Sequence, residues 1–308
     1  MTIGQGNGPD REPLVTVVLP TFNRAEMVVQ AAESIIGQTY PHWELFVVDD
    51  GSTDDTVERL DALAEPRLKV IELVHSGIIS RPRNIGAAAG TGEFLAFLDS
   101  DDVWLPQRLE IQLQALRGSE RAWCYADVGL VGRDGAPIPF RGGRARPVSG
   151  RIARQLLLDQ TGAHIITWLV PRPLFEDSGG FDETLLSHGD LDLAIRLAEI
   201  ADAIAVPDVL AIVRDHGGRM TRARADPDER AAIVFKKALE RSRDPALAKI
   251  ARRRWTDHLA RAGANMLAEG DVARAGTLLW RSLIHGAEIA PWLHSLGSGL
   301  RRLSRRRT

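Results

Sequence analysis

Cysteine is nearly absent from this sequence, which has a single one, Cys124, among its 308 residues. One cysteine excludes an internal disulfide framework and is typical of a protein kept in a reducing compartment. Because Cys124 follows Trp123 within an apolar stretch, we interpret it as a small buried residue and not as a reactive thiol.

Long apolar runs are also missing, and no stretch is long enough to span a bilayer. The opening residues, MTIGQGNGPDREP, lack the apolar core of a secretory signal and predict a disordered lead-in over residues 1–12. The formal net charge is only −2, so no overall field attracts nucleic acid, and we expect no nucleic-acid partner. These absences together predict a cytoplasmic protein.

What is present is an alternation of short apolar runs with stretches of helical spacing. The apolar runs cover residues 14–19, 44–48, 68–73 and 94–98; the helical stretches between them cover 24–38, 55–64 and 83–89. This order predicts a parallel sheet with right-handed crossovers. The glycine fingerprint of dinucleotide-binding sheets does not follow the first run.

Polar clusters follow three of these apolar runs, at residues 21–23, 49–52 and 99–102. The carboxyl ends of parallel strands share one edge of a sheet, so we expect the clusters to line one crevice. The third contains Asp99, Asp101 and Asp102, whose like charges need an opposing charge. A solvated acidic turn is one interpretation, but three clusters at one edge favour a site for Mn²⁺ or Mg²⁺.

Four segments resemble family 2 glycosyltransferases with the GT-A fold. They read VTVVLPTFNR, ELFVVDDGSTDDT, RPRNIGAAAGTGEFLAFLDSDDVWLP and HGDLDLAIRLA. The resemblance implies an α/β protein with a Rossmann-like, mainly parallel sheet flanked by helices over residues 13–226. Its nucleotide half would cover about 13–104 and its acceptor half about 105–226. It also implies an inverting, metal-dependent transferase that uses a nucleotide-diphosphate sugar, with UDP as the expected nucleotide.

Within the nucleotide half, the resemblance assigns donor binding to a set of strand-end residues. The set is Pro20, Thr21, Phe22, Asn23, Asp50, Arg83, Asp99 and Ser100. Thr21 and Phe22 would flank a uracil-like ring, and Asp50 would accept a hydrogen bond from the ring N–H. Arg83 would lie near the base and ribose, although Pro82 replaces the small residue usual before it. Asp49 and Asp54 are better interpreted as turn and helix-cap residues.

The metal would be held mainly by Asp101, by resemblance, while Asp99 would contact the ribose hydroxyls or the metal through water. Asp102 either supports these roles or caps the helix after Pro106, and we favour the cap. His216, within the text VRDHGG, would lie near the metal or the diphosphate, since a neutral imidazole is a natural ligand.

Asp190 would be the general base by the same resemblance. Residues two apart on a helix face away from each other, so Asp192 is expected to cap or pair locally. The family often has Glu at the position of Gly189, and this chain departs there. Attack by an acceptor hydroxyl on the anomeric carbon needs a base to take its proton. One carboxylate opposite the leaving group implies a single displacement with inversion.

The acceptor side leaves alternatives open. Trp168 either stacks on a sugar ring or lies in the core. Arg219 and Arg222 follow a Gly-Gly pair and form either a lid that clamps phosphates or a flexible basic loop. We expect a saccharide or glycoconjugate acceptor; a peptide or a small natural product is the alternative. A non-catalytic module that only binds sugar nucleotides is a further alternative, against which Asp99, Asp101 and Asp190 argue.

Beyond residue 226 the sequence becomes rich in Ala, Arg and Leu, and residues 227–308 predict an appended helical region. Breaks at Asp244-Pro245, Gly270-Asp271 and Gly286 divide it into about four helices. The final residues include five arginines: Arg301, Arg302, Arg305, Arg306 and Arg307. We favour a solvated basic tail over peripheral contact with the inner face of an anionic membrane. A homodimer is also left open.

Overall fold

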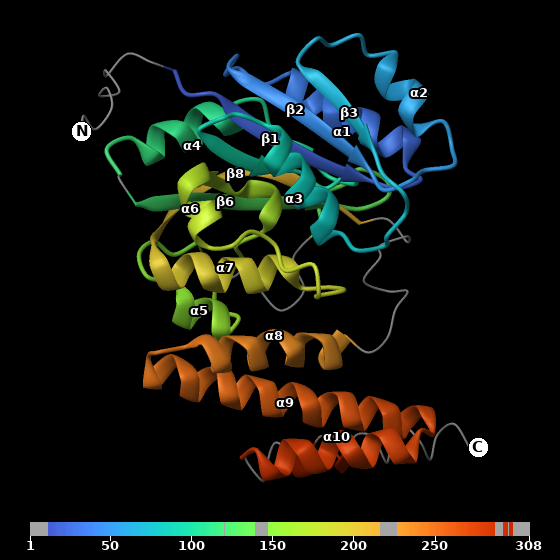
Figure 1. Cartoon of the computed structure of the whole chain (residues 1–308), viewed down its shortest axis with the longest axis vertical. Coiled ribbons are helices and arrows are strands. Elements are labelled where there is room, and N and C mark those ends of the chain that lie inside the picture. The colour runs from blue at the N-terminus through green and yellow to red at the C-terminus, as the bar shows by residue number, and fades with distance from the viewer. Residues whose placement is uncertain are drawn as a thin grey trace.

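The computed structural model describes residues 12–119, 121–138, 147–215, 227–286, 292–294 and 296–297. Within them, an eight-stranded sheet has the strand order β3-β2-β1-β4-β7-β6-β8-β5. Figure 1 shows this sheet and its covering helices at one end of the molecule, with three long helices stacked at the other.

The first half of the sheet is parallel and follows the predicted alternation. Its elements are β1 (Val15–Thr21), α1 (Ala25–Ile36), β2 (Trp43–Asp49), α2 (Thr56–Asp61), β3 (Leu68–Glu72), α3 (Ser80–Ala89) and β4 (Phe94–Phe97). β1 pairs in parallel with both β2 and β4, and β2 with β3. Every residue of β1 is buried because helices cover the sheet, which explains the unbroken apolar run in the sequence.

The second half mixes strand directions. Its elements are β5 (Val103–Trp104), α4 (Arg108–Leu116), β6 (Ala122–Val131), α5 (Ala153–Leu157), the 3₁₀ helix η1 (Ile165–Thr167), β7 (Leu169–Pro171), α6 (Arg172–Asp177), α7 (Gly189–Ile200) and β8 (Asp202–Arg214). β7 is antiparallel to β4 and β6, whereas β6 and β8 are parallel. β5 and α5 were not predicted, since two and five residues are too few for a periodic pattern.

Close packing places α3 directly over β1. A Cβ at Gly86 would lie 2.5 Å from Cγ1 of Val18, and one at Gly90 would lie 2.2 Å from Cγ2 of Thr16. Only glycine permits this approach of helix to strand. The first turn of α3, which carries Arg83, is thereby fixed beside the strand ends.

The C-terminal region forms α8 (Pro227–Arg241), α9 (Pro245–Glu269) and α10 (Val272–Ile284). Both predicted breaks between them are confirmed: Asp244 accepts from the backbone N–H of Ala246 at 2.8 Å, and Gly270 ends α9 with φ of 94°. The predicted fourth helix lies mainly outside the described residues. None of the described helices is both long and apolar enough to cross a bilayer. The division into residues 13–226 and 227–308 stays a prediction.

Candidate active site

The first two polar clusters are joined by hydrogen bonds at the ends of β1 and β2. Asn23 accepts from the backbone N–H of Thr53 at 2.7 Å, and its own N–H donates to Ser52 Oγ at 2.7 Å. Asn23 adopts φ of 49°, a left-handed conformation that asparagine tolerates better than most residues. The predicted meeting of these two clusters is therefore confirmed.

Asp49 and Asp54 have the local roles that the sequence indicated. Asp49 accepts from both the backbone N–H, at 2.8 Å, and the hydroxyl of Ser52. Asp54 accepts from the N–H of Thr56 at 3.2 Å and of Ala25 at 3.3 Å, which are the first residues of α2 and α1. The interpretation of Asp49 and Asp54 as turn and helix-cap residues is therefore confirmed.

Asp50 and Phe22 are held by the loop that follows β3. The carboxylate of Asp50 accepts from the N–H groups of Ser76 at 3.0 Å and Gly77 at 2.9 Å. The ring of His75 stacks on Phe22 with centroids 4.0 Å apart and lies 3.0 Å from Asp50 Oδ2. Ser76 Oγ also donates to Oδ1 at 3.0 Å, so these contacts occupy the roughly four acceptor directions of Asp50, and a base N–H would replace one of them. His75 was not predicted, because no spacing marks a ring contact across loops.

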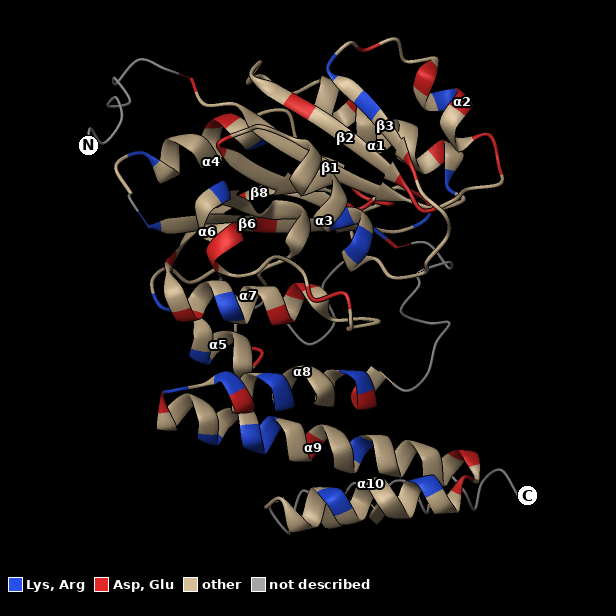
Figure 2. Cartoon of the chain, in the orientation of Figure 1, with Lys and Arg blue, Asp and Glu red and all other residues tan. Residues whose placement is uncertain are grey.

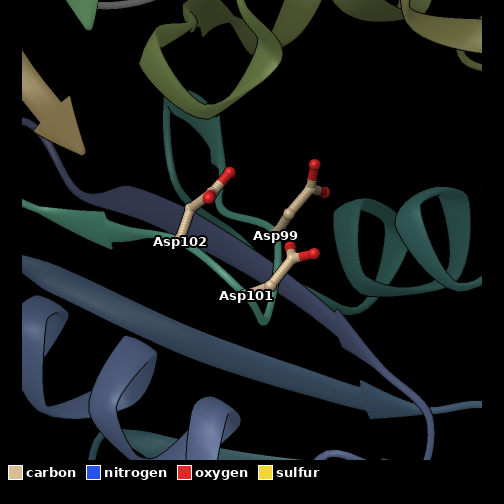
Figure 3. Close-up of side chains that lie close together, drawn as sticks. All are labelled: Asp99, Asp101 and Asp102. Atoms are coloured by element: carbon tan, nitrogen blue, oxygen red, sulfur yellow. The ribbon is translucent and has the colours of Figure 1, made fainter. Parts of the chain in front are cut away.

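The three aspartates after β4 form one group, which we call the carboxylate cluster: Asp99, Asp101 and Asp102. One carboxylate oxygen from each lies within 4.8 Å of the others. Figure 3 shows the three side chains rising from a single loop. Such a group of negative charges needs compensation, and cationic side chains lie beside it.

Arginines from three different elements contact this loop. Arg83 Nη2 lies 2.5 Å from Asp99 Oδ1, and Arg24 Nη1 lies 2.6 Å from Asp101 Oδ2. Arg214, at the end of β8, donates from its backbone N–H to Asp102 at 3.0 Å and from Nε to the Asp101 carbonyl at 2.6 Å. At the start of α4 the backbone N–H of Leu109 donates to Gln38 Oε1 at 3.1 Å, so Gln38 caps this helix and the expectation that Asp102 does so is wrong. Asp102 instead fastens the loop to β8.

Asp190 lies close enough to the carboxylate cluster for its charge to affect the pKa of Asp99. Burial raises the pKa of Asp99, Arg83 opposes that effect, and the charges of Asp101 and Asp190 raise it further. The net result is a raised pKa for Asp99. Asp190, the expected base, therefore lies near Asp99 in the expected metal loop, although the two are 91 positions apart in the sequence.

The start of α7 is in contact with the start of α3. A Cβ at Gly189 would lie 2.7 Å from Ser80 Oγ, which gives a steric reason for glycine where the family often has Glu. His188 precedes it with φ of 59°. Asp192 is buried and bonds Arg196 Nε at 2.9 Å, so the predicted local pairing is confirmed.

Among the residues that the structure describes, three buried polar atoms at this edge find no hydrogen-bond partner: Thr21 Oγ1, Ser80 Oγ and Arg83 Nε. Buried polar groups are nearly always satisfied, and leaving one unpaired costs about 1–3 kcal/mol. All three lie on the first residues of α3 or the last residue of β1. A polar ligand at this edge would satisfy them.

The carboxylate cluster offers the oxygen ligands that Mg²⁺ and Mn²⁺ prefer. Octahedral Mg²⁺ binds oxygens at about 2.1 Å, so opposed ligands stand about 4.2 Å apart. The 4.8 Å spread of the cluster is slightly wider, and Arg24 lies on Asp101. The residues fit a divalent cation if the loop closes slightly and Arg24 is released.

Other predicted residues fall elsewhere. Trp168 is fully buried, donates to the Ala163 carbonyl at 3.1 Å and meets Trp123 with centroids 5.4 Å apart, so sugar stacking is wrong and the core alternative is right. Pro20 pairs with Val48 inside the sheet, and Ser100 is buried in the acidic loop. His216, Arg219 and Arg222 lie outside the described residues.

Comparison with known proteins agrees with this geometry. Residues 16–177 match the family model described as glycosyl transferase family 2. WfgD of Escherichia coli, a UDP-Glc:α-D-GlcNAc-diphosphoundecaprenol β-1,3-glucosyltransferase, is 30% identical over 118 residues, 38% of this chain and 47% of that protein. Glycosyltransferase GlyG of Streptococcus pneumoniae is 33% identical over 106 residues, 34% and 35% of the two chains. The chain thus spans about half or less of these relatives' length.

Solved structures resemble nearly the whole chain. The Staphylococcus aureus TarS fragment 1–349 in complex with UDP-GlcNAc aligns with a TM-score of 0.63 and 18% identity, over 95% of this chain and 82% of that one. The mannosyltransferase PcManGT of Pyrobaculum calidifontis, with GDP-Man and Mn²⁺, aligns with a TM-score of 0.59 and 20% identity, over 97% and 87%. At such identities the likeness shows the fold, which is of the predicted GT-A type.

Proposed function

This chain belongs to glycosyl transferase family 2, and from that premise we propose that it transfers the sugar of a UDP-sugar donor to a hydroxyl of a saccharide or glycoconjugate. One observation carries the proposal: Gly189, beside Asp190 at the start of α7, lies against Ser80 on the first turn of α3, whose Arg83 is paired with Asp99. A base and a cluster for a divalent cation therefore meet at the sheet edge, where Thr21 and Arg83 keep unpaired polar atoms. Donor, cation and acceptor each have a place there.

The donor nucleotide would lie against the strand ends. Phe22 offers a ring face and Asp50 a carboxylate to the base, while Thr21 Oγ1 and Arg83 Nε are free to bond the donor. UDP is favoured over other nucleotides because the name of WfgD specifies UDP-Glc and the TarS fragment binds UDP-GlcNAc. The complex of PcManGT with GDP-Man keeps GDP as the nucleotide to test second.

Mn²⁺ or Mg²⁺ would be held by Asp101 with help from Asp99. When bound, such a cation stabilises negative charge on the departing diphosphate. The Mn²⁺ in the PcManGT complex supports a divalent cation in this fold. Within this chain, Arg83 and Arg24 would balance the aspartates as the donor arrives.

Asp190 would remove the proton from the acceptor hydroxyl. The hydroxyl oxygen then forms its bond to the anomeric carbon as the bond from that carbon to the diphosphate oxygen breaks, with the electron pair leaving on UDP. The proton ends on the Asp190 carboxylate. A single displacement inverts the anomeric centre, so an α-linked donor yields a β-linked product, which NMR of the product checks.

Calorimetric titration of UDP tests the donor site, with and without Mn²⁺, on the wild type, Asp101→Ala and Asp55→Ala. Asp55 is a matched control, because this exposed aspartate forms its ion pair with Arg59. We expect Mn²⁺-dependent UDP binding that is lost in Asp101→Ala and kept in Asp55→Ala. UDP affinity that is the same with and without Mn²⁺, and the same in the wild type and Asp101→Ala, would overturn the metal assignment.

Turnover is then tested with UDP-glucose and UDP-GlcNAc against acceptors. The name of WfgD includes a GlcNAc-diphosphoundecaprenol acceptor, which supports a saccharide carried on a lipid diphosphate. Transfer to synthetic GlcNAc-diphospholipid or free saccharides is the expected result. Transfer only to peptides or small natural products would replace the acceptor class, and UDP binding without any transfer or hydrolysis would favour a binding module.

A membrane-bound acceptor suits the C-terminal region, for which we propose contact with an anionic membrane. Residues 227–308 carry 17 Lys and Arg against 8 Asp and Glu, whereas residues 1–226 carry 22 against 33. Blue bands recur along α9 and α10 in Figure 2. On α10 the apolar side chains of Val272, Trp280 and Ile284 are 60%, 62% and 54% exposed. Apolar residues beside basic ones are typical of interfacial helices.

Sedimentation with vesicles tests this contact. Binding to phosphatidylglycerol-containing vesicles, weaker binding to pure phosphatidylcholine, and loss in Trp280→Ser/Ile284→Ser are expected. Val74→Ser is the control, since Val74 is even more exposed, at 86%, but lies after β3. If the exposed apolar side chains of α10 instead join two copies of the chain, light scattering will give twice the chain mass for the wild type. Trp280→Ser/Ile284→Ser will then give the mass of a single chain.

A further inference from the structure

Three basic residues of α8 point toward the segment that carries Asp190. Arg230, Lys237 and Arg241 are spaced seven and four residues apart, which places them on one face of a helix. The opposite side of α8 packs on α9, where Phe235 stacks on His258 with centroids 5.0 Å apart. α8 is thus a rigid element between α9 and the transferase fold.

This face of α8 holds the segment before α7. Lys237 Nζ lies 2.5 Å from Asp182 Oδ2 and donates to Thr184 Oγ1 at 3.0 Å. One further bond runs from Arg230 to the Leu186 carbonyl at 3.4 Å. Residues 182–186 belong to no helix or strand, so apart from the buried side chain of Leu185 these contacts with α8 hold the segment in place.

The same face also holds α7 itself, beyond Asp190. Arg241 Nε lies 2.9 Å from Glu199 Oε2, and its Nη1 lies 3.4 Å from Asp192 Oδ1. Asp192 is 1% exposed and two positions after Asp190. The expected base is therefore flanked on both sides in the chain by residues that α8 binds.

On its other side, the segment is held by α3. Asn84 accepts from the backbone N–H of Phe181 at 2.9 Å and donates to the Phe181 carbonyl at 2.9 Å. Asn84 follows Arg83, which bonds Asp99. A continuous series of contacts thus runs from the carboxylate cluster through α3 and residues 181–184 to Lys237.

We propose that α8 is a positioning element of the active site, which sets where Asp190 stands relative to Asp99 through Lys237 and Arg241. The catalytic part of this inference rests on the proposed transferase function; the structural part does not. A helical region that looks like an appendage in the sequence is then required for full turnover. Lys237 and Arg241 touch no expected substrate atom and act through the α7 segment.

Lys237→Met tests the proposal, with Lys236→Met as the matched control. Lys236 is the neighbouring lysine, and its ion pair is with Glu240 on the same helix at 3.2 Å. The first readout is amide hydrogen exchange of peptides covering residues 181–193. We expect exchange there to rise about fivefold in Lys237→Met, which corresponds to a local loss near 1 kcal/mol, and to stay unchanged in Lys236→Met.

The second readout separates positioning from general damage. We expect the rate of UDP release from UDP-glucose to fall roughly tenfold or more in Lys237→Met, because small misplacements of catalytic groups are costly, while UDP affinity stays within about twofold. Lys237→Arg, which can still reach Asp182, should restore both exchange and rate.

Three outcomes would overturn the proposal. The first is equal hydrogen exchange of residues 181–193 in Lys237→Met and Lys236→Met. The second is exchange that rises throughout the chain in Lys237→Met together with a loss of UDP affinity. The third is exchange that rises only in residues 181–193 with no change in the rate of UDP release from UDP-glucose. If the wild type neither binds UDP nor releases it from UDP-glucose, the proposed function fails instead, and the exchange comparison still decides whether α8 holds the α7 segment.

Discussion

Arg24 and Asp101 form an ion pair, with 2.6 Å between a guanidinium nitrogen and a carboxylate oxygen. Arg24 follows directly on the β1 turn that carries Phe22 and Asn23, and Asp101 is the residue expected to bind the metal. Both side chains are largely shielded from water. The arginine therefore neutralises a carboxylate that a bound cation would need, and it links the turn after β1 to the loop of the carboxylate cluster.

Removing this arginine should strengthen binding of the metal alone. In Arg24→Met, a cation no longer has to displace a paired guanidinium from Asp101, so we expect Mn²⁺ affinity without nucleotide to rise roughly threefold to tenfold. Titration followed by Mn²⁺ electron paramagnetic resonance measures it. Arg59→Met is the control, because Arg59 pairs with the exposed Asp55. Equal Mn²⁺ affinity in the two variants would contradict the competition.

The bond between Lys237 and Asp182 should make stability depend on acid. Burial alone would raise the pKa of Asp182, but hydrogen bonds from Lys237 and Thr184 lower it from 3.8 to about 2. A carboxyl whose pKa is lower in the folded state stabilises the protein above its unfolded pKa and loses that contribution as the pH falls toward 2. The contribution at neutral pH is at most about 2 kcal/mol, since solvent screens the partly exposed pair.

Urea unfolding of Lys237→Met and Lys236→Met over a pH series measures this effect. At pH 6 we expect the first variant to have the lower free energy of unfolding. The gap should shrink as the pH falls from 4 toward 2, because Asp182 becomes protonated. A gap that stays constant with pH would show that Lys237 contributes by packing and not by charge.

A methyl group added at Gly189 should crowd the hydroxyl of Ser80, which must shift to make room for it. A Cβ there would lie 2.7 Å from Ser80 Oγ, and overpacking of this kind typically costs about 1–3 kcal/mol. Gly189→Ala should therefore lower the thermal midpoint and slow UDP release from UDP-glucose by displacing Asp190. Adding Ser80→Gly should recover much of the loss.

Gly276→Ala is the control for this pair. Gly276 lies in α10, where an added Cβ meets nothing within 4 Å, so alanine should be neutral or slightly stabilising. Failure of Ser80→Gly to suppress Gly189→Ala would mean that the two helix starts do not constrain each other sterically.

The sequence predicted the parallel first half of the sheet and the residues at the strand ends because both follow from local patterns. Apolar runs define β1, β2 and β4, and parallel connections force their polar ends to one edge. The motifs that resemble the family then supplied roles for Asp50 and Asp101, and those roles stay predictions.

What the sequence could not supply are contacts set by distant parts of the chain. Asp102 was expected to cap the next helix, but β8 returns 112 positions later and places the Arg214 N–H on its carboxylate. Trp168 was undecided because the burial of a tryptophan depends on the packing of β6 against η1. Arg24 and Lys237 carry no local signal, since a basic residue near a turn or on a helix is usually solvated.

Arg108 on α4 is a further residue whose environment the sequence could not supply, because this arginine is fully buried. Its Nη2 donates to the Trp168 carbonyl at 2.8 Å and its guanidinium lies 3.7 Å from the centre of the Trp104 ring, while Nε and Nη1 have no hydrogen-bond partner. Burial lowers the pKa of Arg108 from 12.5 to about 9. The folded state therefore holds this proton less tightly than the unfolded state does.

The pH dependence of an Arg108→Met variant follows from that difference. Below pH 9 wild-type Arg108 is charged in both states and the folded protein bears the full cost of burying it; above pH 9 the folded state sheds the proton and the wild type gains stability. We expect the free energy of unfolding of the wild type, relative to Arg108→Met, to rise by about 1 kcal/mol between pH 8 and pH 10. Urea unfolding at both pH values measures it. A relative stability that is flat or falls over this range would mean that Arg108 keeps its proton in the folded state, held by the Trp104 ring and the Trp168 carbonyl.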